Sequence, residues 1–94
     1  DEASISQFFQ THPPAYFINC AAYTAVDKAE SEQDIAYRIN AQAVAEIAHH
    51  CSLSNTILIH FSTDYVFDGK GTTPYTINTP TSPVNYYGYT KRVG

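Results

Sequence analysis

Residues 31–62 read SEQDIAYRINAQAVAEIAHHCSLSNTILIHFS, and this stretch decides the fold class. Its first part predicts an amphipathic helix of about five turns, because apolar residues recur at helical spacing; they are Ile35, Ala36, Ile39, Ala43, Val44, Ile47, Ala48 and Cys51. Ser31 and Asp34 resemble a loose capping box at its start. Residues 56–62 (TILIHFS) are apolar and rich in β-formers, so they predict a buried strand.

The preceding residues continue this alternation. Residues 3–10 predict the end of a helix that stops before Pro13-Pro14. Residues 15–20 (AYFINC) predict a second buried parallel strand, and residues 23–31 lack periodicity and predict a loop. After residue 67 the composition changes: residues 68–83 are rich in Gly, Pro and Thr and predict a long, functional loop. A last helix is expected to begin near Asn85.

Strands that alternate with long helices predict an α/β fold with a doubly wound parallel sheet. Two strands do not form a stable sheet by themselves. We therefore expect residues 1–94 to be the middle of a larger α/β domain, with flanking strands on both sides.

Composition limits the function. The chain has 94 residues, 44% apolar, with a formal net charge of −4, which is enough for one small domain. The five Lys and Arg residues form no basic stripe, so a nucleic-acid partner is not expected. No apolar run approaches the roughly 20 residues of a membrane span, and no signal-peptide pattern opens the chain. We expect a cytoplasmic protein in which Cys20 and Cys51 are reduced and partly buried.

Tyr87 and Lys91 are four residues apart on the last predicted helix, so their side chains share one face. A nearby ammonium favours the phenolate form of a tyrosine and helps a phenol exchange protons near neutral pH. Tyr plus Lys at this spacing is therefore a sensible proton donor for a carbonyl oxygen. Taken alone, such a pair is more often a surface pair on a helix.

Two other segments follow the carboxyl ends of the predicted strands, where open α/β sheets bind ligands. Ser62 and Thr63 follow the second strand, and their hydroxyls could bind a substrate carbonyl or could form a local cap. Residues 19–24 (NCAAYT) follow the first strand. Their small side chains either let a flat ligand approach the backbone or simply pack tightly under a helix.

Three segments together are far more specific: NCAAYTAVDKAE (residues 19–30), STDYVFDG (62–69) and SPVNYYGYTK (82–91). In order and spacing they resemble the dTDP-4-dehydrorhamnose reductases, a family of the extended short-chain dehydrogenase/reductase superfamily. The resemblance runs from about Phe17 to the end of the chain. It implies a partial Rossmann-like NAD(P)-binding domain.

The resemblance also implies roles for single residues. Thr63 would polarise the substrate carbonyl, Tyr87 would donate a proton, and Lys91 would assist Tyr87 and bind the nicotinamide ribose. The implied cofactor-binding residues are Asn19, Cys20, Ala21, Ala22, Tyr23, Ser62, Tyr87 and Lys91. The implied substrate-binding residues are Thr63, Asp64, Tyr65 and Tyr87. Asn40 matches the helix asparagine of the superfamily, which is either structural or part of a proton relay.

Cys20 stands where the family usually has Ala, a small change that leaves the cofactor edge apolar. No Gly-rich phosphate-binding turn is present: the four glycines are Gly69, Gly71, Gly88 and Gly94. We expect the Gly-rich βαβ unit before Asp1 and the rest of the substrate-binding part after Gly94.

No metal site is expected, because His49 and His50 are adjacent on a helix and point about 100° apart. We expect both to be exposed, and His60 to be a satisfied sheet residue.

The resemblance implies that the longer protein uses NADPH or NADH to reduce the 4-keto group of dTDP-4-dehydro-6-deoxy-L-mannose to dTDP-L-rhamnose. Two alternatives stay open: a non-catalytic NADP-binding subunit resembling the β subunit of methionine adenosyltransferase, and another nucleotide-sugar epimerase or dehydratase. The expected partners are a dTDP-sugar and further copies of the protein, since exposed strand edges invite association. The 94-residue chain alone is expected to be inactive.

Overall fold

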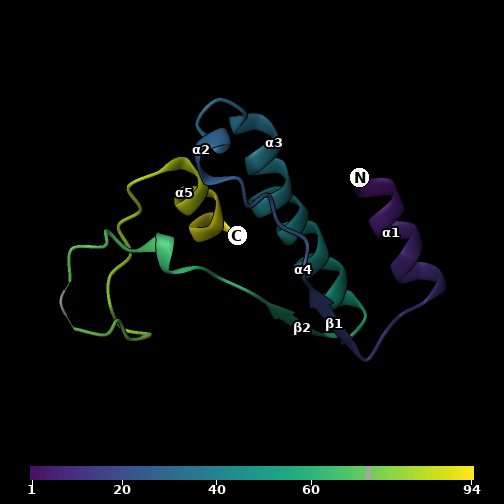
Figure 1. The fold of residues 1–94 in the computed structure, drawn as a ribbon. Coiled ribbons are helices and arrows are strands. Elements are labelled where there is room, and N and C mark those ends of the chain that lie inside the picture. The colour runs from purple at the N-terminus through teal and green to yellow at the C-terminus, as the bar shows by residue number, and fades with distance from the viewer. Residues whose placement is uncertain (72) are drawn as a thin grey trace.

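Two parallel strands form the sheet of the molecule, β1 (Tyr16–Asn19) and β2 (Ile57–His60) (Figure 1). In this computed structural model, which describes residues 1–71 and 73–94, Tyr16 pairs with Ile57 and Asn19 with His60. The parallel register puts the carboxyl ends of both strands at the same edge of the sheet. Both predicted strands and their parallel order are confirmed.

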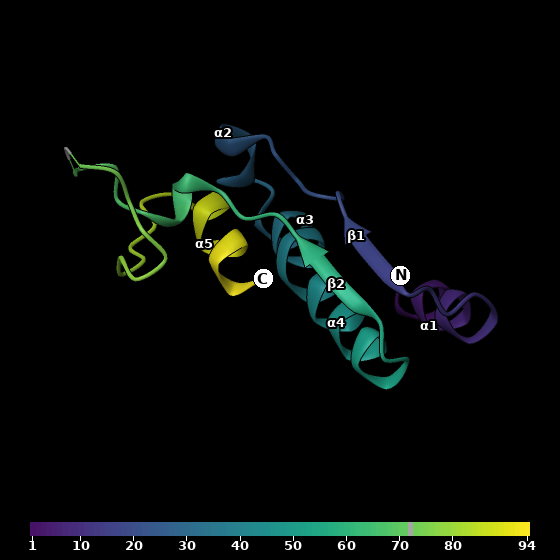
Figure 2. The same cartoon turned by 90° about the horizontal axis from the view of Figure 1, so that it is seen from below.

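One long helix connects the two strands, in three consecutive parts: α3 (Gln33–Tyr37), a π-helical turn η1 (Arg38–Gln42) and α4 (Ala43–Leu53). Figure 2 shows it running along one face of the sheet. The predicted helix is confirmed, but the predicted capping box is wrong. The helix begins after Glu32 without a side-chain cap, because the Ser31 hydroxyl donates to the backbone oxygen of Lys28 instead (3.1 Å).

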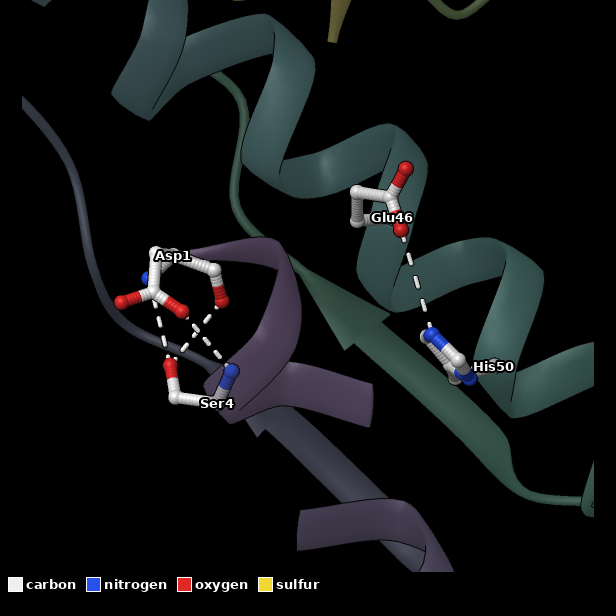
Figure 3. A network of polar contacts seen from close by, with 4 residues as sticks. All are labelled: Asp1, Ser4, Glu46 and His50. Atoms are coloured by element: carbon white, nitrogen blue, oxygen red, sulfur yellow. Dashed lines mark hydrogen bonds and ion pairs between the residues drawn. The ribbon is translucent and has the colours of Figure 1, made fainter. Parts of the chain in front are cut away.

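The first helix, α1 (Glu2–Thr11), packs on α4. Asp1 caps it by accepting from the backbone of Ser4 (2.8 Å), and Figure 3 shows this start of α1 near Glu46 and His50. His50 lies 3.8 Å from Glu46 and stacks on the Phe9 ring. The expectation of two exposed histidines is therefore right for His49 and wrong for His50, because α1 covers that part of α4.

The core lies on the helical face of the sheet. Phe9, Ile47 and Cys51 form its buried centre, and Phe17 and Leu58 pack against them from the strands. The other face is open, which corrects the prediction of strands buried on both faces. Four strand side chains are 41–62% exposed there, because the described helices cover one face only; they are Tyr16, Ile18, Ile57 and Ile59.

The remaining elements lie beyond the carboxyl ends of the strands. A short helix, α2 (Val26–Ala29), lies where a loop was predicted, because Ala29 is buried against Ala36 and Tyr87. A 3₁₀ turn, η2 (Asp64–Val66), follows β2, and helix α5 (Tyr86–Val93) begins after Asn85 as predicted. The expected long loop joins η2 to α5 in the described residues. Of the cysteines, Cys51 is buried and Cys20 is exposed.

No helix within residues 1–71 and 73–94 is long and apolar enough to cross a membrane.

Candidate active site

Helix α5 carries two of the predicted catalytic residues, and its start is held by two side chains. The Asn85 side chain accepts from the backbone N–H of Gly88 (2.7 Å), and the Glu30 carboxylate accepts from that of Tyr86 (2.7 Å). A carboxylate at a helix N-terminus also suits the helix dipole. The buried face of α5 carries Tyr87, Gly88, Thr90 and Lys91. The start of the helix at Asn85 agrees with the prediction, whereas the contact of Glu30 with the helix start joins residues 56 positions apart in the sequence.

Lys91 is 6% exposed, and its ammonium donates to the backbone oxygen of Phe61 (2.8 Å). This bond places the Lys91 ammonium at the carboxyl end of β2. Burial lowers the pKa of Lys91 from its ordinary value. A lysine ammonium has three donors, so two remain for other groups at this edge.

Thr63 lies at the turn that follows β2, where it caps η2 by accepting from the backbone N–H of Tyr65 (3.3 Å). The Tyr65 ring meets the Tyr87 ring edge to face, with centroids 5.7 Å apart. The Thr63 turn and the Tyr87 helix are therefore in contact although 24 positions separate them in sequence. Asp64 and Tyr65 are exposed, and Thr63 is half-buried.

The end of β1 is linked to the end of β2 through Asn19, which is 6% exposed. Its side-chain oxygen accepts from the Ala21 backbone (3.2 Å), so its nitrogen faces His60 Nδ1 (3.2 Å). Because an amide nitrogen only donates, His60 Nδ1 accepts and the imidazole is neutral, with its proton on Nε2. Burial, and then the charge of Lys91, lowers the pKa of His60 in agreement with this assignment. His60 Nε2 is buried without a hydrogen-bond partner among the described residues, so the expectation of a satisfied sheet histidine holds for only one ring nitrogen.

Asn40 connects three parts of the site from within the π-helical turn and is 1% exposed. Its amide accepts from the Tyr23 backbone N–H (2.8 Å) and donates to the Tyr23 carbonyl (3.0 Å). It also donates to the Thr90 hydroxyl (3.0 Å), which in turn donates to the carbonyl of Tyr87 (2.8 Å). These contacts give Asn40 a structural role, one of the two that the sequence left open.

Thr90 did not stand out in the sequence. The only available signal was a hydroxyl residue on the same helical face as Tyr87.

The predicted cofactor residues fall into two groups. Cys20, Ala21 and Ser62 are exposed at the carboxyl edge of the sheet, whereas Ala22 and Tyr23 are partly buried. Tyr23 packs against the cluster of Ala29, Ala36 and Tyr87, and its hydroxyl is buried without a described partner. The small exposed side chains, and the two Lys91 donors for which the described residues offer no acceptor, fit the flat ring and ribose of a nicotinamide nucleotide.

The edge is open rather than enclosed. Two pockets, of about 360 and 510 Å³, lie elsewhere, over α3 and the start of α5, and neither is lined by Thr63, Tyr87 or Lys91. In the part of the chain that the structure describes, no group of three His, Cys, Asp or Glu side chains could hold a metal ion.

Comparisons with known proteins show which family the chain belongs to. The family described as RmlD substrate binding domain matches residues 1–94. The dTDP-4-dehydrorhamnose reductase of Streptomyces griseus is 44% identical over the whole chain, which covers 31% of that protein. The dTDP-4-keto-6-deoxy-D-glucose reductase of Streptomyces niveus is 39% identical over the whole chain, which covers 33% of it. The chain thus spans about a third of the length of these relatives.

A crystal structure of dTDP-4-dehydrorhamnose reductase from Bacillus anthracis in complex with NADP superposes with a TM-score of 0.95 at 39% identity. It matches 99% of this chain, which covers 33% of that structure. With the parallel strands and the helix between them, this likeness confirms the predicted fold class, a partial Rossmann-like α/β domain.

Proposed function

This chain belongs to the RmlD substrate binding domain family, and on that basis we propose that the protein containing it is an NAD(P)H-dependent dTDP-4-dehydrorhamnose reductase. One observation carries the proposal beyond family membership. The Thr63 turn contacts helix α5 through the Tyr65 and Tyr87 rings, and the Lys91 ammonium of the same helix reaches the carboxyl end of β2. The three residues thus come from two segments that are separate in the sequence. A carbonyl reduction needs a hydroxyl, a proton donor and a cation in such an arrangement.

The substrate of this reaction is the 4-keto group of dTDP-4-dehydro-6-deoxy-L-mannose, and the product is dTDP-L-rhamnose. The Thr63 oxygen accepts from the Tyr65 backbone N–H, and among the described residues its proton has only a long contact with Asp64 (3.4 Å). That proton is therefore available to the carbonyl oxygen of the sugar. Tyr87 donates the proton that this oxygen takes up as the carbonyl becomes a hydroxyl. Asp64 and Tyr65 contact the sugar from the exposed side of the turn.

The cofactor is NADPH or NADH. Lys91 would hold the nicotinamide ribose through its two remaining donors, and Ser62 would lie beside the nicotinamide ring. Asn19, Cys20, Ala21, Ala22 and Tyr23 would line the cofactor along the end of β1. When bound, the reduced nicotinamide supplies the hydride for the carbonyl carbon. The Lys91 ammonium is held at the carboxyl end of β2 by its hydrogen bond to the Phe61 carbonyl.

The experiment compares NADPH oxidation by the full-length protein, given dTDP-4-dehydro-6-deoxy-L-mannose, with that of a Tyr87→Phe variant. Loss of general-acid catalysis should lower kcat by roughly 100- to 10,000-fold. Tyr89→Phe is the matched control, because Tyr89 lies on the same helix but is 41% exposed. It should keep nearly full activity.

The same assay tests the alternatives. NADPH binding without turnover would contradict the reductase and favour a non-catalytic NADP-binding subunit. The name of the Streptomyces niveus relative makes dTDP-4-keto-6-deoxy-D-glucose the second sugar to assay. Faster turnover of that sugar would keep the reaction type and change the substrate. Interconversion of a nucleotide sugar without net NADPH consumption would instead favour an epimerase or a dehydratase.

The proposal includes a cytoplasmic location and association between copies of the full-length protein. Light scattering coupled to size-exclusion chromatography measures the second point directly. A monomer at micromolar concentration would contradict it.

A further inference from the structure

Gly88 lies where helix α5 meets the turn after β2. A Cβ atom built on Gly88 would collide with the backbone oxygen of Tyr65, and it would lie 3.0 Å from the Tyr65 carbonyl carbon. The side-chain oxygen of Asn85 would be 3.1 Å away. A backbone carbonyl cannot rotate out of the way as the end of a flexible side chain can. Any side chain at position 88 therefore has to push α5 and the turn apart.

This contact lies between two of the proposed catalytic groups. On one side, both peptide groups of Tyr65 are bonded to Thr63. The Tyr65 N–H donates to the Thr63 hydroxyl, and the Val66 N–H, which shares a peptide with the Tyr65 carbonyl, donates to the Thr63 carbonyl (3.3 Å each). On the other side, Gly88 directly follows Tyr87. The closeness of α5 to the turn thus decides how near the Thr63 hydroxyl can come to Tyr87.

Helix formation gives no reason for a glycine here. Gly88 lies inside α5, and alanine forms helices better than glycine does. A purely local effect of Gly88→Ala would therefore strengthen the helix. The close approach to Tyr65 accounts for the glycine, at the cost of a less favourable helical residue.

We propose that Gly88 is a positioning residue of the reductase: its missing side chain lets the Thr63 turn contact helix α5, and this contact sets the geometry between Thr63 and Tyr87. The inference rests on the proposed function for its catalytic consequence. Its structural part, the direct contact of Gly88 with the Tyr65 peptide, is independent of the activity.

The test uses the full-length protein with Gly88→Ala, and Gly71→Ala as the control. Among the described residues, the nearest atoms to a Cβ at Gly71 would belong to the side chain of Tyr75, 3.3 Å away, and this side chain can move. A displacement of about 1 Å between catalytic groups can cost roughly 100-fold, so kcat should fall by that order in Gly88→Ala. NADPH affinity and the KM for the sugar should change little. Gly71→Ala should behave like the wild type.

A double-mutant cycle separates positioning from general damage. If Gly88→Ala acts by displacing the Thr63 hydroxyl, it should cost far less in a Thr63→Val background than in the wild type. If the two losses in kcat simply multiply, the inference is wrong. An active Gly88→Ala variant with wild-type kcat would overturn it as well.

A crystal structure of Gly88→Ala provides the readout that does not depend on activity. The Tyr65 carbonyl should lie farther from α5 than in the wild type, and an unchanged turn would overturn the inference. If the wild type fails to reduce the sugar while the variant shows this displacement, the proposed function fails and the contact stands. If the variant does not fold, a wild-type crystal structure decides: Gly88 and the Tyr65 carbonyl out of contact would refute the inference.

Discussion

The Asn40 side chain makes hydrogen bonds to the Tyr23 backbone that another backbone segment would otherwise make. The Tyr23 segment has both its N–H and its C=O bonded to one buried amide, as if to a neighbouring strand. Removing that amide would leave buried groups unpaired, at about 1 to 3 kcal/mol each. The π-helical turn at Arg38–Gln42 holds Asn40 at this place, and such turns are frequent at functional sites.

His60 gives the protein a pH dependence whose sign follows from its burial. Its pKa lies below the ordinary 6.5 in the folded state, so the unfolded state binds more protons. The stabilisation that comes from a neutral His60 is complete above pH 6.5. It is lost as the pH falls through the pKa that His60 has in the folded state, which is below 6.5. In His60→Gln, the free energy of unfolding of the full-length protein should depend less on pH in this range.

Urea unfolding at several pH values between about 5 and 8, the range in which histidines titrate, measures this pH dependence of the free energy of unfolding. His49→Gln is the control, because His49 is exposed on the same chain. A pH profile of His60→Gln that matches the wild type would show that His60 does not carry the dependence.

At the scale of elements, α5 depends on two side-chain acceptors that lie outside it. Asn85 and Glu30 together accept from two of the backbone N–H groups that a helix start leaves unpaired. The position of α5 is also limited near its end, because a Cβ at Gly94 would collide with the Asn40 carbonyl. The helix that carries Tyr87 and Lys91 is thus held at its start, on its buried face and near its end.

Asn85→Ala removes one of these acceptors. The expected loss is about 1 kcal/mol in the free energy of unfolding, the usual effect of deleting a helix cap. The loss of kcat should be larger than for a surface mutation, because the first turn carries Tyr87. Thermal and urea unfolding with parallel kinetics measure both effects, and Asn78→Ala, in the exposed loop, should change neither. Equal effects of the two substitutions would argue against a cap.

At the scale of the whole molecule, the open face of the sheet is the dominant feature. Five large apolar side chains are 41–62% exposed along it and just beyond it; they are Tyr16, Ile18, Ile57, Ile59 and Phe61. A contiguous apolar patch of this kind marks a surface that another structure covers. The relatives, about three times longer than this chain, have ample sequence to cover it.

The 94-residue chain produced alone should therefore bind a hydrophobic dye, associate with itself, and show no NADPH oxidation with the keto sugar. The full-length protein should bind little of the dye and should oxidise NADPH with the keto sugar. Dye fluorescence, light scattering and the kinetic assay make the comparison. A monomeric, dye-silent short chain with normal turnover would contradict this expectation.

The sequence by itself determined the α/β class, both strands, the long helix and the start of α5, because each depends on local periodicity and caps. It also singled out Tyr87, Lys91 and Thr63 through spacing and motif order.

Only the tertiary structure decided which strand face is covered, that α2 forms and that α1 packs over His50. It alone also showed that Glu30, Thr90 and Gly88 hold the site. These features depend on contacts between residues far apart in the sequence. Local pattern cannot encode such contacts, because packing, and not propensity, selects them.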